Sequence, residues 1–311
     1  MKNRRLVSCL LVLLLCVHLF AGCAQAESRG ILYRVVGGKN EMTILGSIHI
    51  GNQDMYPFSE TIQNAIERAD VFVYECDTES AEALQATMAL MSYPVGEGIA
   101  SHLSSNTYDL LCDAAQKSGY PISLLQGFKP WAVVSLLSMD TAAVEMGTDD
   151  VLEALELGVE KQVMLMAEGR ETAYLETTRE QLEMMDSFSA ELQEYMVSSA
   201  CELILHPESL SAGDASVRYW PEWWAAGNAE AFAQSYLQEN VEDPHPELMQ
   251  EYHEKLNAQR NVRMARRIAE LLETGHGQRF FVTVGLLHLV LPDDSIVAEL
   301  EKMGYTVERI F

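Results

Sequence analysis

Two histidines in matching contexts are the first residues that could do chemistry. His49 follows a strand-forming run in ILGSIHIG, and His288 follows another in FFVTVGLLHLV. In each copy a glycine stands three positions before the histidine, Gly46 in the first and Gly285 in the second. Glycine suits a strand end, because it allows positive φ angles and close approach of another segment. We interpret each glycine as a turn that brings its histidine over the edge of a sheet.

A carboxylate ends a third apolar run, since Glu75 comes directly after VFVY. Ligands collect at the carboxyl ends of parallel strands, so His49, Glu75 and His288 converge if their strands are neighbours. Two imidazoles and one carboxylate are typical of an open metal site for Zn, Mn, Co or Fe. Such an ion activates water or polarises a carbonyl group. The alternative is that the histidines are hydrogen-bonded core residues and Glu75 is a capped strand end.

One arginine, Arg260, stands beside the apolar stripe of a long helical pattern, LNAQRNVRMARRIAELL. Arg260 and Met264 are four apart and share a helix face. An arginine in that position needs a carboxylate partner or an anion that develops during a reaction. The residues alone favour the other interpretation, a surface arginine like its neighbour Arg263. His253 lies seven positions before Arg260 and is interpreted as a surface residue, although it could share that face.

The alternation of apolar and polar residues predicts the strands that position these residues, and helical periodicity predicts the helices. The predicted strands are 31–36, 42–45, 71–75, 161–168, 280–284 and 305–310. The predicted helices are 59–69, 79–92, 107–118, 130–139, 149–158, 178–208, 246–274 and 294–302, with a loop over 239–245. The pattern predicts an α/β fold with a central, mostly parallel sheet formed by N- and C-terminal βα units, and a largely helical midsection. No linker divides residues 31–311, so we expect a single domain there.

The N-terminus has the pattern of a lipoprotein signal. Basic residues, an apolar run and Ala-Gly-Cys follow one another, which predicts a signal peptide over residues 1–22 and a lipidated Cys23. Residues 23–30 are then a tether to the membrane, and the protein lies outside the bacterial cytoplasmic membrane as a lipoprotein. An ordinary signal cut after Ala24 or Ala26 is the alternative.

Charge and motif content exclude several functions. The 311 residues carry a formal net charge of −25, which argues against nucleic-acid partners, because phosphate contacts need basic surface. The cysteines left after the signal and Cys23 are Cys76, Cys112 and Cys201, which form no disulfide framework. The chain has no G-x-S-x-G, H-E-x-x-H or phosphate-binding glycine loop, which excludes serine hydrolases of that type, zincins and nucleotide enzymes.

These motifs and their order resemble the TraB/PrgY/GumN family, which includes the TIKI proteases that inactivate Wnt. The matching segments are Gly46-Ser47-Ile48-His49, Tyr56-Pro57, Glu75, Lys129-Pro130-Trp131, Gly147-Thr148-Asp149, Leu175-Glu176-Thr177 with Gln181, Trp224 with Gly227, Arg260-Asn261, Val284 to Leu289, and Gly304-Tyr305. The chain departs from the family pattern at Asn228 and Leu291, where the family has Asp and Gly.

The resemblance implies a metal-dependent peptidase. Its essential residues would be His49, Glu75, Arg260 and His288, the two histidines and the glutamate being the ligands of a divalent ion. It also implies that Arg260 pairs with a site carboxylate or stabilises an oxyanion, which reverses the interpretation from the residues alone. Three further matching residues, Asp149, Glu176 and Asn261, are expected to orient the ligands.

Other members of that family are linked to pheromone shutdown or polysaccharide export. We therefore expect a lipid-anchored hydrolase with a peptide or protein substrate. Two alternatives stay open: a lipoprotein that only binds a peptide or haem, and a hydrolase that uses histidine and glutamate without a metal.

Overall fold

The computed structural model describes residues 27–148, 150–209, 216–275 and 277–311. The predicted signal peptide, Cys23 and Asp149 lie outside these residues, so their predictions stay untested.

Six strands of the described chain form one mixed sheet in the order β4-β3-β5-β2-β1-β6. Their bounds are Leu32–Val36 (β1), Glu41–Ser47 (β2), Val71–Tyr74 (β3), Glu171–Tyr174 (β4), Arg279–Gly285 (β5) and Thr306–Arg309 (β6). β5 pairs in parallel with β2 and β3, and β3 pairs in parallel with β4. β1 is antiparallel to both β2 and β6. The predicted mostly parallel sheet is confirmed, and the strands that precede His49, Glu75 and His288 are the neighbours β2, β3 and β5.

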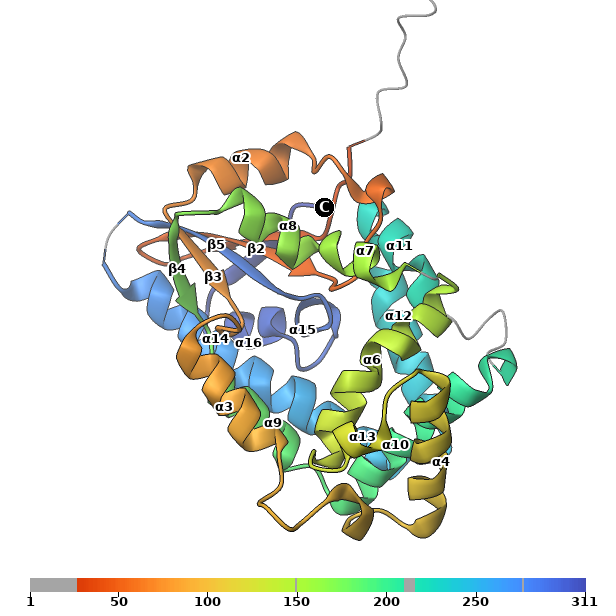
Figure 1. Cartoon of the computed structure of the whole chain (residues 1–311). Helices are drawn as coiled ribbons and strands as arrows, with labels where there is room; N and C mark the ends of the chain where they lie inside the picture. Colours follow the sequence, from red (N-terminus) through yellow and green to blue (C-terminus); the bar gives the residue numbers. More distant parts are fainter. Residues whose placement is uncertain (1–26, 149, 210–215, 276) are drawn as a thin grey trace, which may run out of the picture.

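Helices cover both faces of the sheet (Figure 1). On one face lie Glu60–Arg68 (α2) and Val159–Met166 (α8), and on the other lie Gln259–Glu273 (α14), Leu287–Val290 (α15) and Ile296–Lys302 (α16). Their buried side chains, among them Ile66, Val163 and Ile268, join the fully buried strand residues in one apolar core. α2 begins where predicted, because the Ser59 hydroxyl accepts a hydrogen bond from the Ile62 amide and caps the helix.

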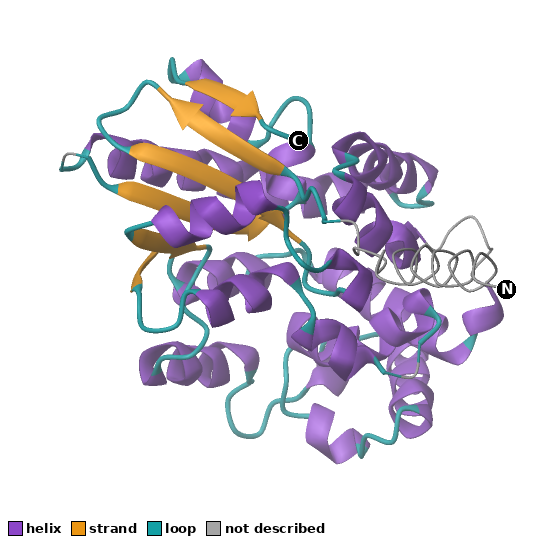
Figure 2. Ribbon diagram, turned by 90° about the horizontal axis from the view of Figure 1, so that it is seen from above, coloured by secondary structure: helices purple, strands orange, loops and turns teal. Residues whose placement is uncertain are grey.

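A helical region lies beside the sheet (Figures 1 and 2). Its helices are Ala81–Met91 (α3), Ser105–Lys117 (α4), Ile122–Leu125 (α5), Pro130–Met146 (α6), Val151–Glu156 (α7), Thr178–Asp186 (α9), Ala190–Leu205 (α10), Trp220–Ala226 (α11), Ala229–Glu242 (α12) and Pro246–His253 (α13). α10 packs against α4 and α6, and Leu111, Leu137 and Val197 are buried between them in a second core. The predicted helical midsection is confirmed.

One predicted strand is wrong. Residues 161–166 belong to α8 and residues 167–168 to the turn after it, because Val159 and Val163, four apart, face the core while Leu165 and Met166 are exposed. The strand after it is β4, a short edge strand whose mixed burial gave little hydrophobic signal.

Other boundaries also differ from the predictions, and α6 ends at Met146 rather than at residue 139. The helix predicted over 178–208 is broken into α9 and α10, since Ser189 caps a new helix. α12 extends through Glu242 into the predicted loop. The helix predicted over 246–274 contains a π-helical turn, Glu254–Ala258 (η5), between α13 and α14. Within the described residues, none of the helices has the length and apolar character needed to cross a membrane.

Candidate functional site

The carboxyl ends of β2, β3 and β5 meet at one edge of the sheet, as the sequence predicted. Glu75 follows β3, and its Oε1 accepts a hydrogen bond of 2.6 Å from the amide of Gly285 at the end of β5. A Cβ atom at Gly285 would lie 3.2 Å from that oxygen, and one at Gly46 would lie 2.4 Å from the Leu286 side chain. Both glycines therefore serve close approach rather than a positive φ angle.

Arg260 is the centre of a buried network at this edge, which corrects the surface interpretation drawn from the residues alone. Its side chain is only 5% exposed. Nη2 donates to Glu75 Oε2 at 2.6 Å and also to Glu176 Oε1, and Nε donates to Glu176 Oε1 at 2.9 Å. Nη1 lies 3.3 Å from Leu256 O and 3.3 Å from His288 Nε2. These contacts use all five N–H groups of the guanidinium, so its position is fully specified.

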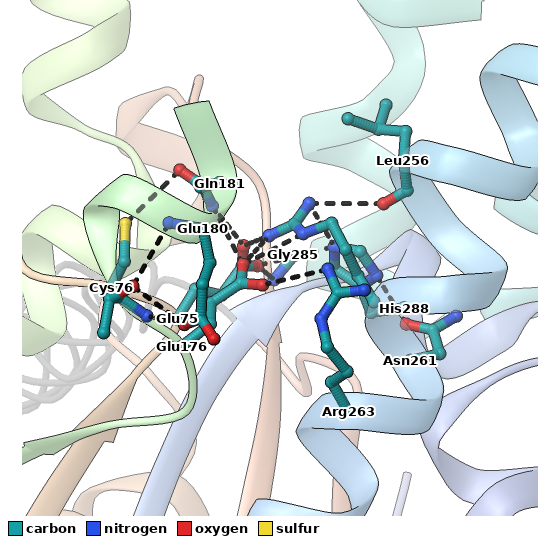
Figure 3. Close-up of polar contacts among 12 residues, drawn as sticks. Glu75, Cys76, Glu176, Glu180, Gln181, Leu256, Asn261, Arg263, Gly285 and His288 are labelled. Carbon is teal, nitrogen blue, oxygen red and sulfur yellow. Dashed lines mark hydrogen bonds and ion pairs between the residues drawn. The ribbon is translucent and has the colours of Figure 1, made fainter. Parts of the chain in front are cut away.

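The hydrogen bonds of His288 define its tautomer. Asn261 donates through Nδ2 to the backbone oxygen of Asp294 at 2.7 Å. This leaves Asn261 Oδ1 as the acceptor that faces His288 Nδ1 at 2.6 Å (Figure 3). His288 Nδ1 therefore carries the proton, and Nε2 presents its lone pair to Arg260. Burial, together with the charge of Arg260, lowers the pKa of His288 to about 4. This imidazole is neutral near pH 7.

Glu75 is held as a carboxylate. Burial alone would raise its pKa, but the charge of His288, which is protonated at low pH, the charge of Arg260 and the hydrogen bond from the Gly285 amide outweigh burial and lower the pKa to about 2. Gln181 contributes further hydrogen bonds, from Nε2 to Glu75 Oε2 at 3.4 Å and to Glu176 Oε1 at 3.2 Å. Glu176 is buried, and it shares Arg260 and Gln181 with Glu75. Two carboxylates thus share one guanidinium, and the buried network carries more negative than positive charge.

Glu75 also lines a hollow of about 430 Å³, together with His49 and Glu160. The His49 side chain is 77% exposed, and its Nδ1 lies 3.8 Å from Glu160 Oε2. The two G-x-x-H histidines therefore have different environments, because His288 is buried behind Glu75 while His49 faces the open hollow.

Glu160 is a functional candidate that the sequence reasoning missed. It lies in the first turn of α8, and the Val159 amide next to it bonds to Ile48 O at 3.0 Å, which fixes α8 against the loop that carries His49. Burial, and less strongly the charge of Glu75, raise the pKa of Glu160, while His49 acts in the opposite direction. Glu160 fell between the predicted helix 149–158 and the predicted strand 161–168, so the sequence gave no signal that this carboxyl faces the site.

The three predicted metal ligands do not fit an ion as their side chains lie. Arg260 already bonds to Glu75 Oε2 and faces His288 Nε2, while His49 Nδ1 lies 3.8 Å from Glu160 Oε2. Among the described residues, no cluster of three His, Cys, Asp or Glu side chains is placed to bind a metal ion. Metal dependence stays a prediction that direct metal analysis has to test.

The comparisons with known proteins agree with the motif order. The model of the TraB/PrgY/gumN family matches residues 31–309, which is most of the chain. Searches of the curated proteins and of the solved structures gave no match. Since the family match spans both the sheet and the helical region, the chain belongs to the TraB/PrgY/gumN family.

Proposed function

We propose that this protein is a lipid-anchored hydrolase that acts outside the cytoplasm and cleaves peptide bonds. The observation that carries the proposal is the arrangement around Glu75, whose carboxylate joins the buried Arg260 network to a hollow lined by His49 and Glu160. Hydrolases place paired acid and base groups in such a hollow, and carboxyls with opposite pKa shifts mark candidates for the two roles.

Each side chain has a role that follows from its environment. Glu75 stays ionised and orients a water molecule, since a carboxylate with a pKa of about 2 is a weak base. His49 is exposed and free to accept that water's proton and to pass it to the leaving group, while Glu160 orients His49. Arg260 and His288 do not line the hollow, and they act by holding Glu75 in place.

The geometry favours hydrolysis without a metal over the metal-dependent alternative. Arg260 supplies a fixed positive charge beside Glu75, where the ion was expected. If a divalent ion is bound, it would have to compete with Arg260 for Glu75 and His288. An ion there would supply Lewis-acid activation of water.

The test is cleavage of a broad peptide library by the full-length protein in detergent, read by mass spectrometry. We expect cleavage by the wild type, a loss of at least 100-fold in Glu75→Gln, and unchanged cleavage in Glu67→Gln, an exposed glutamate on α2. Equal cleavage by both variants, or no cleavage by the wild type, would overturn the proposal. Activity that survives a chelator supports hydrolysis without a metal, and activity that needs added Mn, Co, Zn or Fe supports the metal-dependent alternative.

A further inference from the structure

A row of polar side chains runs along the helix that leads to Arg260. His253, Asn257 and Asn261 occur at every fourth position through α13, η5 and α14. Asn257 and Asn261 are 2% and 0% exposed, so their amides are buried and need partners. The sequence reasoning interpreted His253 as a surface residue, but its side chain is only 25% exposed.

The first partner is Asp294, in the loop between α15 and α16. Its Oδ2 lies 2.6 Å from His253 Nε2, and its backbone oxygen accepts from Asn261 Nδ2 at 2.7 Å. The side chain of Asp294 therefore contacts His253, and the main-chain oxygen of Asp294 holds Asn261. Asn261 in turn accepts the Nδ1 proton of His288 at 2.6 Å.

The second partner is Tyr236 on α12. Its hydroxyl accepts from Asn257 Nδ2 at 3.0 Å and lies 3.1 Å from His253 Nδ1. This contact ties His253 and the π-helical turn to a third helix. The turn also supplies Leu256 O to Arg260 Nη1 at 3.3 Å, and such turns often occur at functional sites.

The geometry points to His253 and Asp294 as positioning residues for the reaction of the neighbouring site. They fix Asn261, which selects the His288 tautomer that accepts from Arg260, and Arg260 fixes Glu75. This inference rests on the proposed hydrolase function for its kinetic part only, because the tautomer of His288 can be measured without any substrate.

The environment of the pair distinguishes it from ordinary surface pairs. His206 also lies beside a carboxylate, with Nδ1 at 3.3 Å from Glu208 Oε1, but its side chain is 58% exposed and it lies far along the chain from the site. The His253–Asp294 contact is shorter, half-buried and continuous with buried amides. A small displacement of a catalytic group is enough to lower a rate strongly.

The experiment compares His253→Ala and Asp294→Ala with the control His206→Ala, all in the full-length protein. Alanine at position 294 keeps the backbone oxygen, so the variant tests the carboxylate alone. We expect kcat for peptide cleavage to fall about tenfold or more in both variants, with KM little changed, and to stay unchanged in the control. His253→Gln, whose amide can still donate to Asp294, should recover most of the loss.

The second readout is nitrogen-15 NMR of the histidine rings, with the His288 signals assigned from a His288→Gln spectrum. In the wild type we expect a proton on Nδ1 and a bare Nε2, and in His253→Ala and Asp294→Ala a shift toward the other tautomer or exchange between the two. Wild-type ring signals in both variants, or an unchanged kcat with intact folding, would overturn the inference. If the wild type cleaves no peptide, the proposed function fails. The ring signals would still show whether His253 and Asp294 set the tautomer of His288.

Discussion

Replacing Arg260 with methionine should destabilise the protein strongly. The variant keeps most of the apolar volume but removes the guanidinium that bonds to both Glu75 and Glu176. These carboxylates have side chains only 13% and 2% exposed, so water does not replace the lost donors. Breaking one partner of a buried charge pair typically costs about 3–5 kcal/mol. Because Glu75 and Glu176 keep hydrogen bonds from Gly285 and Gln181, we expect the lower part of that range.

Urea unfolding at pH 7, followed by circular dichroism, measures this loss. With a slope of about 2–3 kcal/mol per molar urea, the midpoint should fall by about 1 M or more. Arg266→Met, at an exposed position of the same helix, is the control and should stay within about 0.5 kcal/mol of the wild type.

A double variant tests the physical reason for the effect. Glu176→Gln removes one of the two buried carboxylates, so in the Arg260→Met background it should restore part of the lost free energy of unfolding. Glu176→Gln alone should instead destabilise, since it weakens the pair with Arg260. A midpoint for Arg260→Met equal to that of Arg266→Met, or strictly additive effects in the double variant, would refute the buried-network reasoning.

Three further predictions concern charge and metal. Hydrogen bonds and attraction from Arg279 lower the pKa of Asp70 from 3.8 to about 2. The stabilisation by the Asp70 carboxylate is therefore present above pH 4 and is lost as pH falls toward 2. We expect the difference in melting temperature between wild type and Asp70→Asn to shrink over that pH range. Burial raises the pKa of Glu160, so ionisation of Glu160 opposes folding. Glu160→Gln should therefore melt at the same or a higher temperature at pH 7, while it cleaves peptides about tenfold more slowly. A lower melting temperature would contradict the expected effect of Glu160 ionisation on stability. Elemental analysis of the wild type should find less than stoichiometric Mn, Co, Zn or Fe, and a stoichiometric ion that disappears in a His49→Ala, His288→Ala double variant would show that Arg260 gives way to the ion.

The sheet could be predicted from the sequence because its central strands have a strong local signal. The run VFVY of β3 is buried along its whole length, and β5 is buried except at its ends. β4 was missed for the opposite reason, since an edge strand with half-exposed side chains lacks the apolar run that marks a central one. In α8 the run VMLM fits the residue pattern of a strand as well as that of a helix. Val159 lies before the run and four positions from Val163, and the burial of both residues fits the spacing of a helix.

The candidate site could be predicted in part, and the missing part follows from long-range packing. Glu75 and His288 are near each other because β3 and β5 are neighbours, a result that parallel-sheet topology made probable from sequence alone. The burial of Arg260 depends on Glu176, which is 84 positions away in the chain, and on the π-helical turn, where Leu256 O accepts from Arg260 Nη1. Periodicity of an ideal helix contains neither fact, so residue patterns alone favoured a solvent-exposed arginine.

The two G-x-x-H copies differ in environment because their glycines are packed against different neighbours. The Gly285 amide bonds to Glu75, and the chain then enters α15, which turns His288 back toward Arg260. Past Gly46 the chain does not enter a helix, and its loop is held by the amide of Val159 and runs along α8 beside Glu160. A buried imidazole with its lone pair on an arginine suits a fixed structural role, whereas an exposed imidazole beside a protonatable carboxyl suits proton transfer. The same short motif therefore gives one histidine that is buried beside Arg260 and one that is exposed in the hollow lined by Glu75.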